Sequence, residues 1–233
     1  MLEERFQRLN ALAKINSASK YLEIGVNDGT TFKRVDVSYK VAVDPKFRFN
    51  VQDYANEQTI FHEVTSDSFF SSHASKHGKF DLIYLDGLHT FEQTLRDFRA
   101  SLEYSHQETI WLIDDTYPTG RLATLPSLLL VRIVRRLLGI NDRRWMGDVF
   151  KVVFAIHDFF PQFSYATFPG HGQTVVWPIA RDNVHATWNS LKKITRLGYE
   201  DFLQFRDSHL SVMEPSEILE ILEEGLKLIQ EAA

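Results

Sequence analysis

The stretch YLEIGVNDG, residues 21–29, decides the fold. A short apolar run carries an acid, Glu23, close to its end and then meets Gly25 and Gly29. Glycine lets a backbone turn sharply and lie against a ligand where a side chain would block the approach. The stretch therefore predicts a buried strand that ends in a tight, ligand-binding turn; a tight strand-to-helix connection without a ligand is the alternative.

Further apolar runs follow at 39–44, 80–86 and 109–115, and each is a nearly continuous series of Val, Ile, Leu and aromatic residues. Such runs are typical of strands that are buried on both faces of a parallel sheet. A helical pattern, with Phe91, Leu95 and Phe98 on one face, separates the last two runs. Alternation of strands and helices predicts a doubly wound α/β sheet.

The second half of the chain predicts a pair of strands at 163–168 and 173–179, joined by a turn at 169–172. Helices are expected before, between and after the strands. They fall on the N-terminal stretch with Leu2, Phe6, Leu9 and Ala13 at helical spacing, on 148–160, and on the last 50 or so residues, where Pro215 marks a helix start.

The length of 233 residues suits one α/β domain with additions. We expect a single domain over 1–233, with a core at about 20–180. A helical insertion at 117–147 interrupts this core, and a helical extension follows from about 183 to 233. No internal repeat or low-complexity linker marks a domain boundary.

Composition narrows the class of protein. The formal net charge of -5 disfavours nucleic acid as a partner, and the absence of cysteine rules out disulfides and thiolate metal sites. The charged start MLEERFQRLN is unlike a signal peptide, and no run reaches the roughly 18 apolar residues of a membrane span. We expect a cytoplasmic protein with no membrane span.

Acidic residues lie at the predicted carboxyl ends of four strands. Ligands of open parallel sheets bind beyond these ends. The acids are Glu23, Asp44, Asp86, Asp114 and Asp115. Such a collection along one rim predicts a binding site.

The first two strand ends predict a nucleoside. Asp44 follows Gly25 by 19 residues, which is close to the spacing of an acid that accepts hydrogen bonds from ribose hydroxyls. Asn27 stands where the second glycine of G-x-G-x-x-G would admit a pyrophosphate, and the carboxylates of Glu23 and Asp28 would repel phosphate. A cationic amino-acid nucleoside fits these residues better than a dinucleotide does.

Four segments taken in order resemble class I S-adenosylmethionine-dependent methyltransferases. They are YLEIGVNDG, VAVDP at 41–45, VTSDSF at 64–69 and FDLIYLDGLHTFEQTLRDF at 80–98. The likeness spans about 20–180 and is greatest to the metal-dependent branch that methylates small-molecule hydroxyls. It implies a Rossmann-like, mostly parallel seven-stranded sheet with an antiparallel last strand.

The resemblance also implies cofactor-binding residues. Glu23, Gly25 and Gly29 would line the methionine part of the cofactor, Asp44 would bind the ribose, and Ser66 with Asp67 would lie near the adenine. A helix cap is the alternative for Ser66 and Asp67. The full implied set is Glu23, Gly25, Asn27, Gly29, Asp44, Ser66, Asp67 and Asp86.

In that branch, acids at two neighbouring strand ends hold a divalent ion, which implies metal ligation by Asp86, Asp114 and Asp115. Oxygen ligands favour Mg²⁺, and Mn²⁺ is the other candidate. His89 is a candidate general base or further metal ligand. Together with Asp86, it is the residue that we expect to take part in catalysis. The alternative is a site without metal, in which these residues bind cofactor or substrate or cap a turn and a helix.

Two other patterns attract interpretation. His73 and His77 are four residues apart and are expected at the surface near a helix stop at Gly78. The insertion predicts a helix from Pro126 with an apolar face and a cluster of arginines. The arginines of the insertion are Arg121, Arg132, Arg135, Arg136, Arg143 and Arg144. A lid over the substrate, a dimer contact and a membrane-surface helix all explain this segment.

The sequence as a whole predicts methyl transfer from S-adenosylmethionine to a small-molecule hydroxyl, assisted by a divalent metal. The expected partners are a small-molecule acceptor and a second copy of the chain. Two alternatives stay open: a nucleoside-binding assembly protein without catalysis, and an NAD-dependent oxidoreductase. The missing middle glycine and the acids beside the turn oppose the oxidoreductase.

Overall fold

A computed structural model describes residues 4–141, 144–170 and 172–232. Leu2 and Arg143, and His171 in the turn at 169–172, lie outside the described residues.

The described chain forms a seven-stranded sheet with the order β3-β2-β1-β4-β5-β7-β6. Strand β7 runs antiparallel to both of its neighbours, and the other pairings are parallel. This arrangement confirms the predicted class I methyltransferase fold. The strands are β1 Lys20–Ile24, β2 Tyr39–Val43, β3 Thr59–His62, β4 Leu82–Leu85, β5 Ile110–Ile113, β6 Ser164–Thr167 and β7 Thr174–Trp177.

Strand β3 is the one strand that the apolar runs did not indicate. It lies at an edge of the sheet, and each of its four residues is only half-buried. The central strands β4 and β5 are buried along their whole length, which explains their continuous apolar sequence. In register, Ile24 pairs with Leu85, and Leu85 pairs with Ile113, so the strand ends that bear acids lie at one edge.

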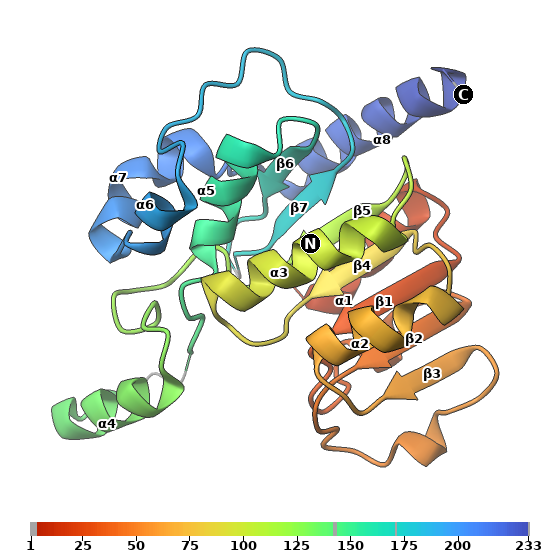
Figure 1. Cartoon of the computed structure of the whole chain (residues 1–233), viewed down its shortest axis with the longest axis horizontal. Helices are drawn as coiled ribbons and strands as arrows, with labels where there is room; N and C mark the ends of the chain where they lie inside the picture. Colours follow the sequence, from red (N-terminus) through yellow and green to blue (C-terminus); the bar gives the residue numbers. More distant parts are fainter. Residues whose placement is uncertain (1–3, 142–143, 171, 233) are drawn as a thin grey trace.

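Helices cover both faces of the sheet (Figure 1). On one face, α1 Arg5–Ile15 and α8 Pro215–Ala232 contact each other and pack with Leu9, Leu12 and Leu222 into one apolar cluster. The other face carries α2 Ser66–Ser72, α3 Phe91–Ser101 and α5 Phe150–Phe159. Helices α6 Leu191–Thr195 and α7 Tyr199–His209 contact α5.

The insertion forms helix α4, Leu128–Leu138, which stands apart from the sheet and the other helices (Figure 1). The helix begins two residues later than the sequence predicted from Pro126, because the hydroxyl of Ser127 accepts a hydrogen bond from the N–H of Leu130 and caps it. Gly139 ends the helix in a left-handed conformation at φ +65°. Within the described residues, no helix combines the length and apolar character needed to cross a membrane.

The expectation of a surface position is wrong for His77, which is buried beneath the sheet edge. Its Nδ1 lies 2.7 Å from the hydroxyl of Tyr39, and its Nε2 lies 2.9 Å from Nε2 of His62. The ring of His73 is 5.0 Å from the ring of His62, centroid to centroid. The helix stop near Gly78 therefore turns this imidazole inward against β2 and β3, where only one proton can occupy the shared His62–His77 contact.

The contact between His62 and His77 predicts that the protein becomes less stable in acid. Burial, reinforced by the charge of His77, lowers the pKa of His62 to about 4, and burial also lowers the pKa of His77. The unfolded chain then binds more protons than the native chain between pH 6.5 and 4, so the free energy of unfolding falls as the pH drops through this range.

The substitution His62→Phe should reduce the loss of unfolding free energy at low pH, because phenylalanine keeps the ring packing but cannot bind a proton. Urea unfolding at pH 7 and pH 4.5 would measure it. The exposed His185→Gln variant should keep the wild-type loss. An undiminished loss in His62→Phe would contradict the assignment.

Candidate functional site

The turn after β1 brings the backbones of three strand ends together. Gly25 has φ +91°, and a Cβ placed on it would lie 1.9 Å from the carbonyl oxygen of Asp86. Asn27, at φ +51°, donates its backbone N–H to Asp44 Oδ2 over 2.8 Å. Gly29 is also left-handed, at φ +75°. The predicted glycine turn therefore fixes β1 against the ends of β2 and β4.

A cavity of about 730 Å³ opens beyond these strand ends, and we call it the rim cavity. It collects six of the eight residues that the resemblance implies for cofactor binding. These are Gly25, Asn27, Asp44, Ser66, Asp67 and Asp86. Glu23 lines a neighbouring cavity of about 370 Å³, the side cavity, together with Gly25, Asn27 and Asp28.

The acids of the rim cavity differ in how fully they are already engaged. Asp44 accepts backbone hydrogen bonds from Asn27 and Lys46, at 2.8 and 2.7 Å. Gln93 Nε2 donates to Ser66 Oγ and to Asp67 Oδ1, and Arg96 forms an ion pair with Asp67 at 2.9 Å. The side chain that caps α2 belongs to Thr65, so Ser66 and Asp67 occupy its first turn.

Glu23 is a buried carboxyl group beside the glycine turn. Only 2% of its surface is exposed, and Tyr21 donates its hydroxyl proton to Oε2 over 2.5 Å. Burial raises the pKa of Glu23 to about 8, although the hydrogen bond from Tyr21 and the charge of Arg5 oppose this effect. A cation that enters the side cavity would restore the charged form.

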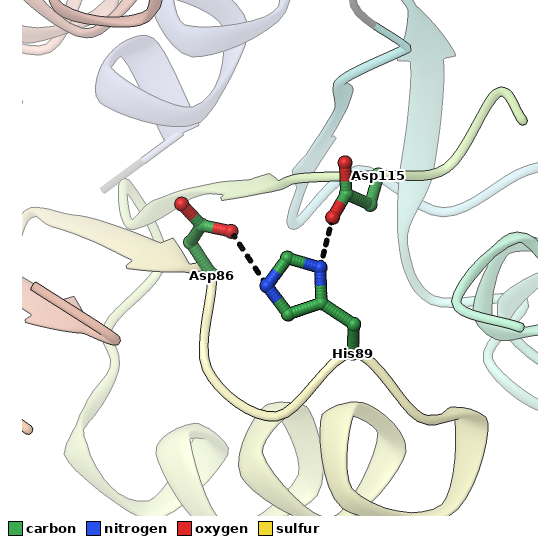
Figure 2. Close-up of side chains that lie close together, drawn as sticks. All are labelled: Asp86, His89 and Asp115. Carbon is green, nitrogen blue, oxygen red and sulfur yellow. Dashed lines mark ion pairs between the residues drawn. The ribbon is translucent and has the colours of Figure 1, made fainter. Parts of the chain in front are cut away.

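Asp86, His89 and Asp115 converge in a second group at the rim (Figure 2). Asp86 follows β4 directly, His89 precedes α3, and Asp115 follows β5 with a left-handed φ of +60°. One ligand atom from each lies within 4.8 Å of the others. His89 Nε2 is 3.7 Å from Asp86 Oδ1, and Nδ1 forms an ion pair with Asp115 Oδ2.

Asp114 is not part of this group of ligand atoms, and its carboxylate pairs with an arginine. Arg5 NH2 lies 2.5 Å from Asp114 Oδ2, and NH1 lies 3.8 Å from Asp86 Oδ2. The ligand atoms of Asp86, His89 and Asp115 thus lie together, whereas the resemblance implied a set with Asp114 and left His89 as a candidate base or further ligand.

The electrostatics of the group suit a divalent cation. Burial raises the pKa of Asp86 and of Asp115, and the charge of Asp114 adds to both shifts. Burial lowers the pKa of His89, but the hydrogen bond and charge of Asp115 outweigh it, and the pKa is raised.

Two atoms of the group also lack further partners. His89 Nδ1 and Asp115 Oδ2 are buried without a hydrogen bond to any other group of the described chain. Two carboxylates and an imidazole form a donor set that first-row divalent ions accept. The residues therefore fit a metal, and the surplus of buried negative charge is what such an ion would relieve.

A larger cavity, of about 1070 Å³, also borders this group, and we call it the front cavity. Its walls include His89, Asp115, Arg5 and Trp145. The rings of Trp145 and His89 stack at 5.0 Å and 19°. Sequence reasoning missed Arg5, which resembles any polar residue of a packing helix, and gave no site role to Trp145, which the insertion folds back onto the rim.

Comparison with known proteins supports the predicted family and fold. A family model described as a methyltransferase domain matches residues 22–116, from within β1 to Thr116, just after the Asp114–Asp115 pair. This match supports the methyltransferase family that the sequence predicts. A search of curated protein sequences found no match.

Solved structures share the fold of the methyltransferase domain. An O-methyltransferase from Bacillus cereus in complex with S-adenosylhomocysteine is 17% identical, with a TM-score of 0.52 over 74% of this chain and 80% of that one. A Klebsiella pneumoniae protein described as an O-methyltransferase is 17% identical, with a TM-score of 0.53 over 76% and 80%. A Staphylococcus aureus protein described as a caffeoyl-CoA O-methyltransferase is 15% identical, with a TM-score of 0.51 over 73% and 81%.

The buried carboxyl of Glu23 predicts a stability that falls with rising pH. A native pKa of about 8 exceeds the unfolded value, so the native chain holds the extra proton and loses about 1.4 kcal/mol per pH unit through this group between the two values. Glu23→Gln should remove this slope in urea unfolding from pH 5.5 to 8. The exposed Glu220→Gln variant is the control, and equal slopes in all three proteins would refute the shift.

The ion pair between Arg5 and Asp114 predicts that substitutions of the two residues have strongly coupled effects on stability. Arg5→Met leaves a buried carboxylate without its cation and should destabilise the protein by about 2 kcal/mol. Asp114→Asn in the same chain should recover part of the loss, because the uncompensated charge is then gone. A double-mutant cycle by chemical denaturation measures the coupling, and additive losses would show that the two side chains act independently.

Proposed function

We propose that this protein transfers a methyl group from S-adenosylmethionine to a hydroxyl oxygen of a small molecule, assisted by a divalent metal. One observation carries the proposal: His89 and Arg5 line both the rim cavity and the front cavity. A donor in the rim cavity and an acceptor in the front cavity would meet at the Asp86–His89–Asp115 group.

The rim and side cavities suit the two ends of the cofactor. The carboxylate oxygens of Asp44 have lone pairs beyond those used by the backbone of Asn27 and Lys46, and ribose hydroxyls can donate to them. The side cavity, with Glu23 and Asp28, favours an ammonium group. Ser66 and Asp67 line the rim cavity, where the adenine of the cofactor would bind. The surrounding carboxylates favour a sulfonium cation over a phosphate.

The reaction needs little beyond orientation and removal of one proton. The acceptor oxygen attacks the methyl carbon in line with the leaving sulfur, the new C–O bond forms as the C–S bond breaks, and the electron pair neutralises the sulfonium. A bound divalent ion would supply a lower pKa for the acceptor hydroxyl and a fixed position for its oxygen. Asp86 and Asp115 would hold that ion.

His89 has two roles open to it at this position. It stands between the two carboxylates, so it can complete the ligand set, or its Nε2 can accept the proton of the hydroxyl. His89→Gln separates these roles. Lost metal affinity would identify a ligand, while retained affinity with a lost methyl-transfer rate would identify the base.

The activity is tested by incubating the protein with tritiated methyl donor and a small-molecule extract. Label in small molecules supports the proposal. Thermal unfolding with S-adenosylhomocysteine and with NAD separates the alternatives: stabilisation by NAD alone would favour an oxidoreductase. Stabilisation by S-adenosylhomocysteine with no label transferred to any extract would favour a nucleoside-binding protein without catalysis.

The ligand set predicts how three neighbouring acids differ. Asp86→Asn and Asp115→Asn should each lower Mn²⁺ affinity at least tenfold in calorimetry, because each removes a charged ligand. Asp114→Asn should change it far less, since this carboxylate faces Arg5. Greater loss in Asp114→Asn than in Asp115→Asn would restore the set that the resemblance implied.

A further inference from the structure

Helix α4 exposes most of its large apolar side chains to solvent, although Val131 is buried. Leu137 is 80% exposed, Leu129 is 69% exposed and Leu138 is 64% exposed. Leu129, Ile133 and Leu137 recur every fourth residue and therefore form one stripe along the helix. A helix on the surface of a globular protein normally buries this stripe, so the exposed face predicts a binding surface.

The charge of the same segment is strongly positive. The insertion at 117–147 contains six arginines and a single acid, while the other residues of the chain have a net charge of -10. Arg132 and Arg136 are exposed on α4 beside the apolar stripe. Arg135 is buried and donates to the carbonyl of Arg144, which ties the helix to the end of the insertion.

These charges indicate which kind of partner can bind the apolar stripe. In a symmetric pair of α4 helices, the arginines of one copy would meet those of the other, and α4 has no acid to compensate them. Other large apolar side chains exposed on the described chain occur singly or in pairs on separate elements, such as Leu203 on α7 or Ile221 and Leu228 on α8. They form no apolar surface that matches the stripe.

We propose that α4 binds the surface of an anionic lipid bilayer. Its apolar stripe enters the boundary between headgroups and acyl chains, and Arg132 and Arg136 contact the anionic headgroups. A high apolar asymmetry, arginine as the charged residue and low overall hydrophobicity are the properties of helices that lie in this interface. The separation of α4 from the sheet and the other helices leaves it free to lie flat on the bilayer (Figure 1).

Docking of α4 would bring the site close to the lipid surface. Leu128, the first residue of α4, lines the rim cavity, while Arg144 and Trp145, which follow the helix, line the front cavity. A bilayer-bound protein would therefore meet amphipathic acceptors directly. The proposal for α4 concerns binding alone, and it stands whether or not methyl transfer is confirmed.

Vesicle sedimentation tests the proposal. We expect the full chain to pellet with vesicles of phosphatidylglycerol and phosphatidylcholine at a 1:1 ratio and to stay in solution with phosphatidylcholine alone. The Leu129→Ser/Leu137→Ser variant should lose at least tenfold in affinity. Arg132→Gln/Arg136→Gln should lose roughly fivefold for each arginine, and the wild-type binding should weaken in high salt.

Leu228→Ser, a change of an equally exposed leucine on α8, is the matched control and should bind as the wild type does. Unchanged thermal unfolding of each variant shows that folding is intact. Failure of the wild type to bind the anionic vesicles overturns the proposal. If light scattering then shows a dimer that Leu129→Ser/Leu137→Ser dissociates, the stripe belongs to a second copy of the chain instead.

Discussion

The site depends on the contact between the backbone of Gly25 and the backbone of Asp86. With a Cβ at Gly25 placed only 1.9 Å from the Asp86 carbonyl, no other residue allows the loops after β1 and β4 to approach so closely. This approach brings Glu23 and Asn27 beside Asp86, and the bond from Asn27 then adds Asp44. One steric constraint in the backbone thus gathers carboxylates from three strands at a single rim, where they line the rim cavity or the side cavity.

Gathering so many acids creates an electrostatic cost that the structure relieves only in part. Arg5 compensates Asp114 and reaches toward Asp86, while His89 faces Asp115. Burial is the main cause of the upward pKa shifts of Glu23, Asp86 and Asp115, and the negative charge of Asp114 adds to each of them. A sulfonium nucleoside and a divalent ion are cations, so both proposed ligands would bind where the protein has left charge uncompensated.

The sequence predicts the strands whose residues are all equally buried. It fails where tertiary contacts determine the strand or the direction of a side chain. Strands β4 and β5 are apolar throughout because both faces are buried, so their pattern alone predicts them. Strand β3 is half-buried and short, and no pattern marks it. The acids at the strand ends follow from the parallel register, which also predicts that Asp44 and Asp86 share a rim. Side-chain direction does not follow from it: the split between Asp114 and Asp115, and the inward turn of His77, arise from partners distant in the chain.

The ion pair between Arg5 and Asp114 joins the first turn of α1 to the far end of β5. The two residues are far apart in the sequence, and closing a long loop costs chain entropy, so we expect this contact to form together with the sheet rather than before it. During synthesis, the cation leaves the ribosome long before the carboxylate it neutralises. The ion pair can therefore form only once β5 has been synthesised, and until then α1 lacks this contact with the rim.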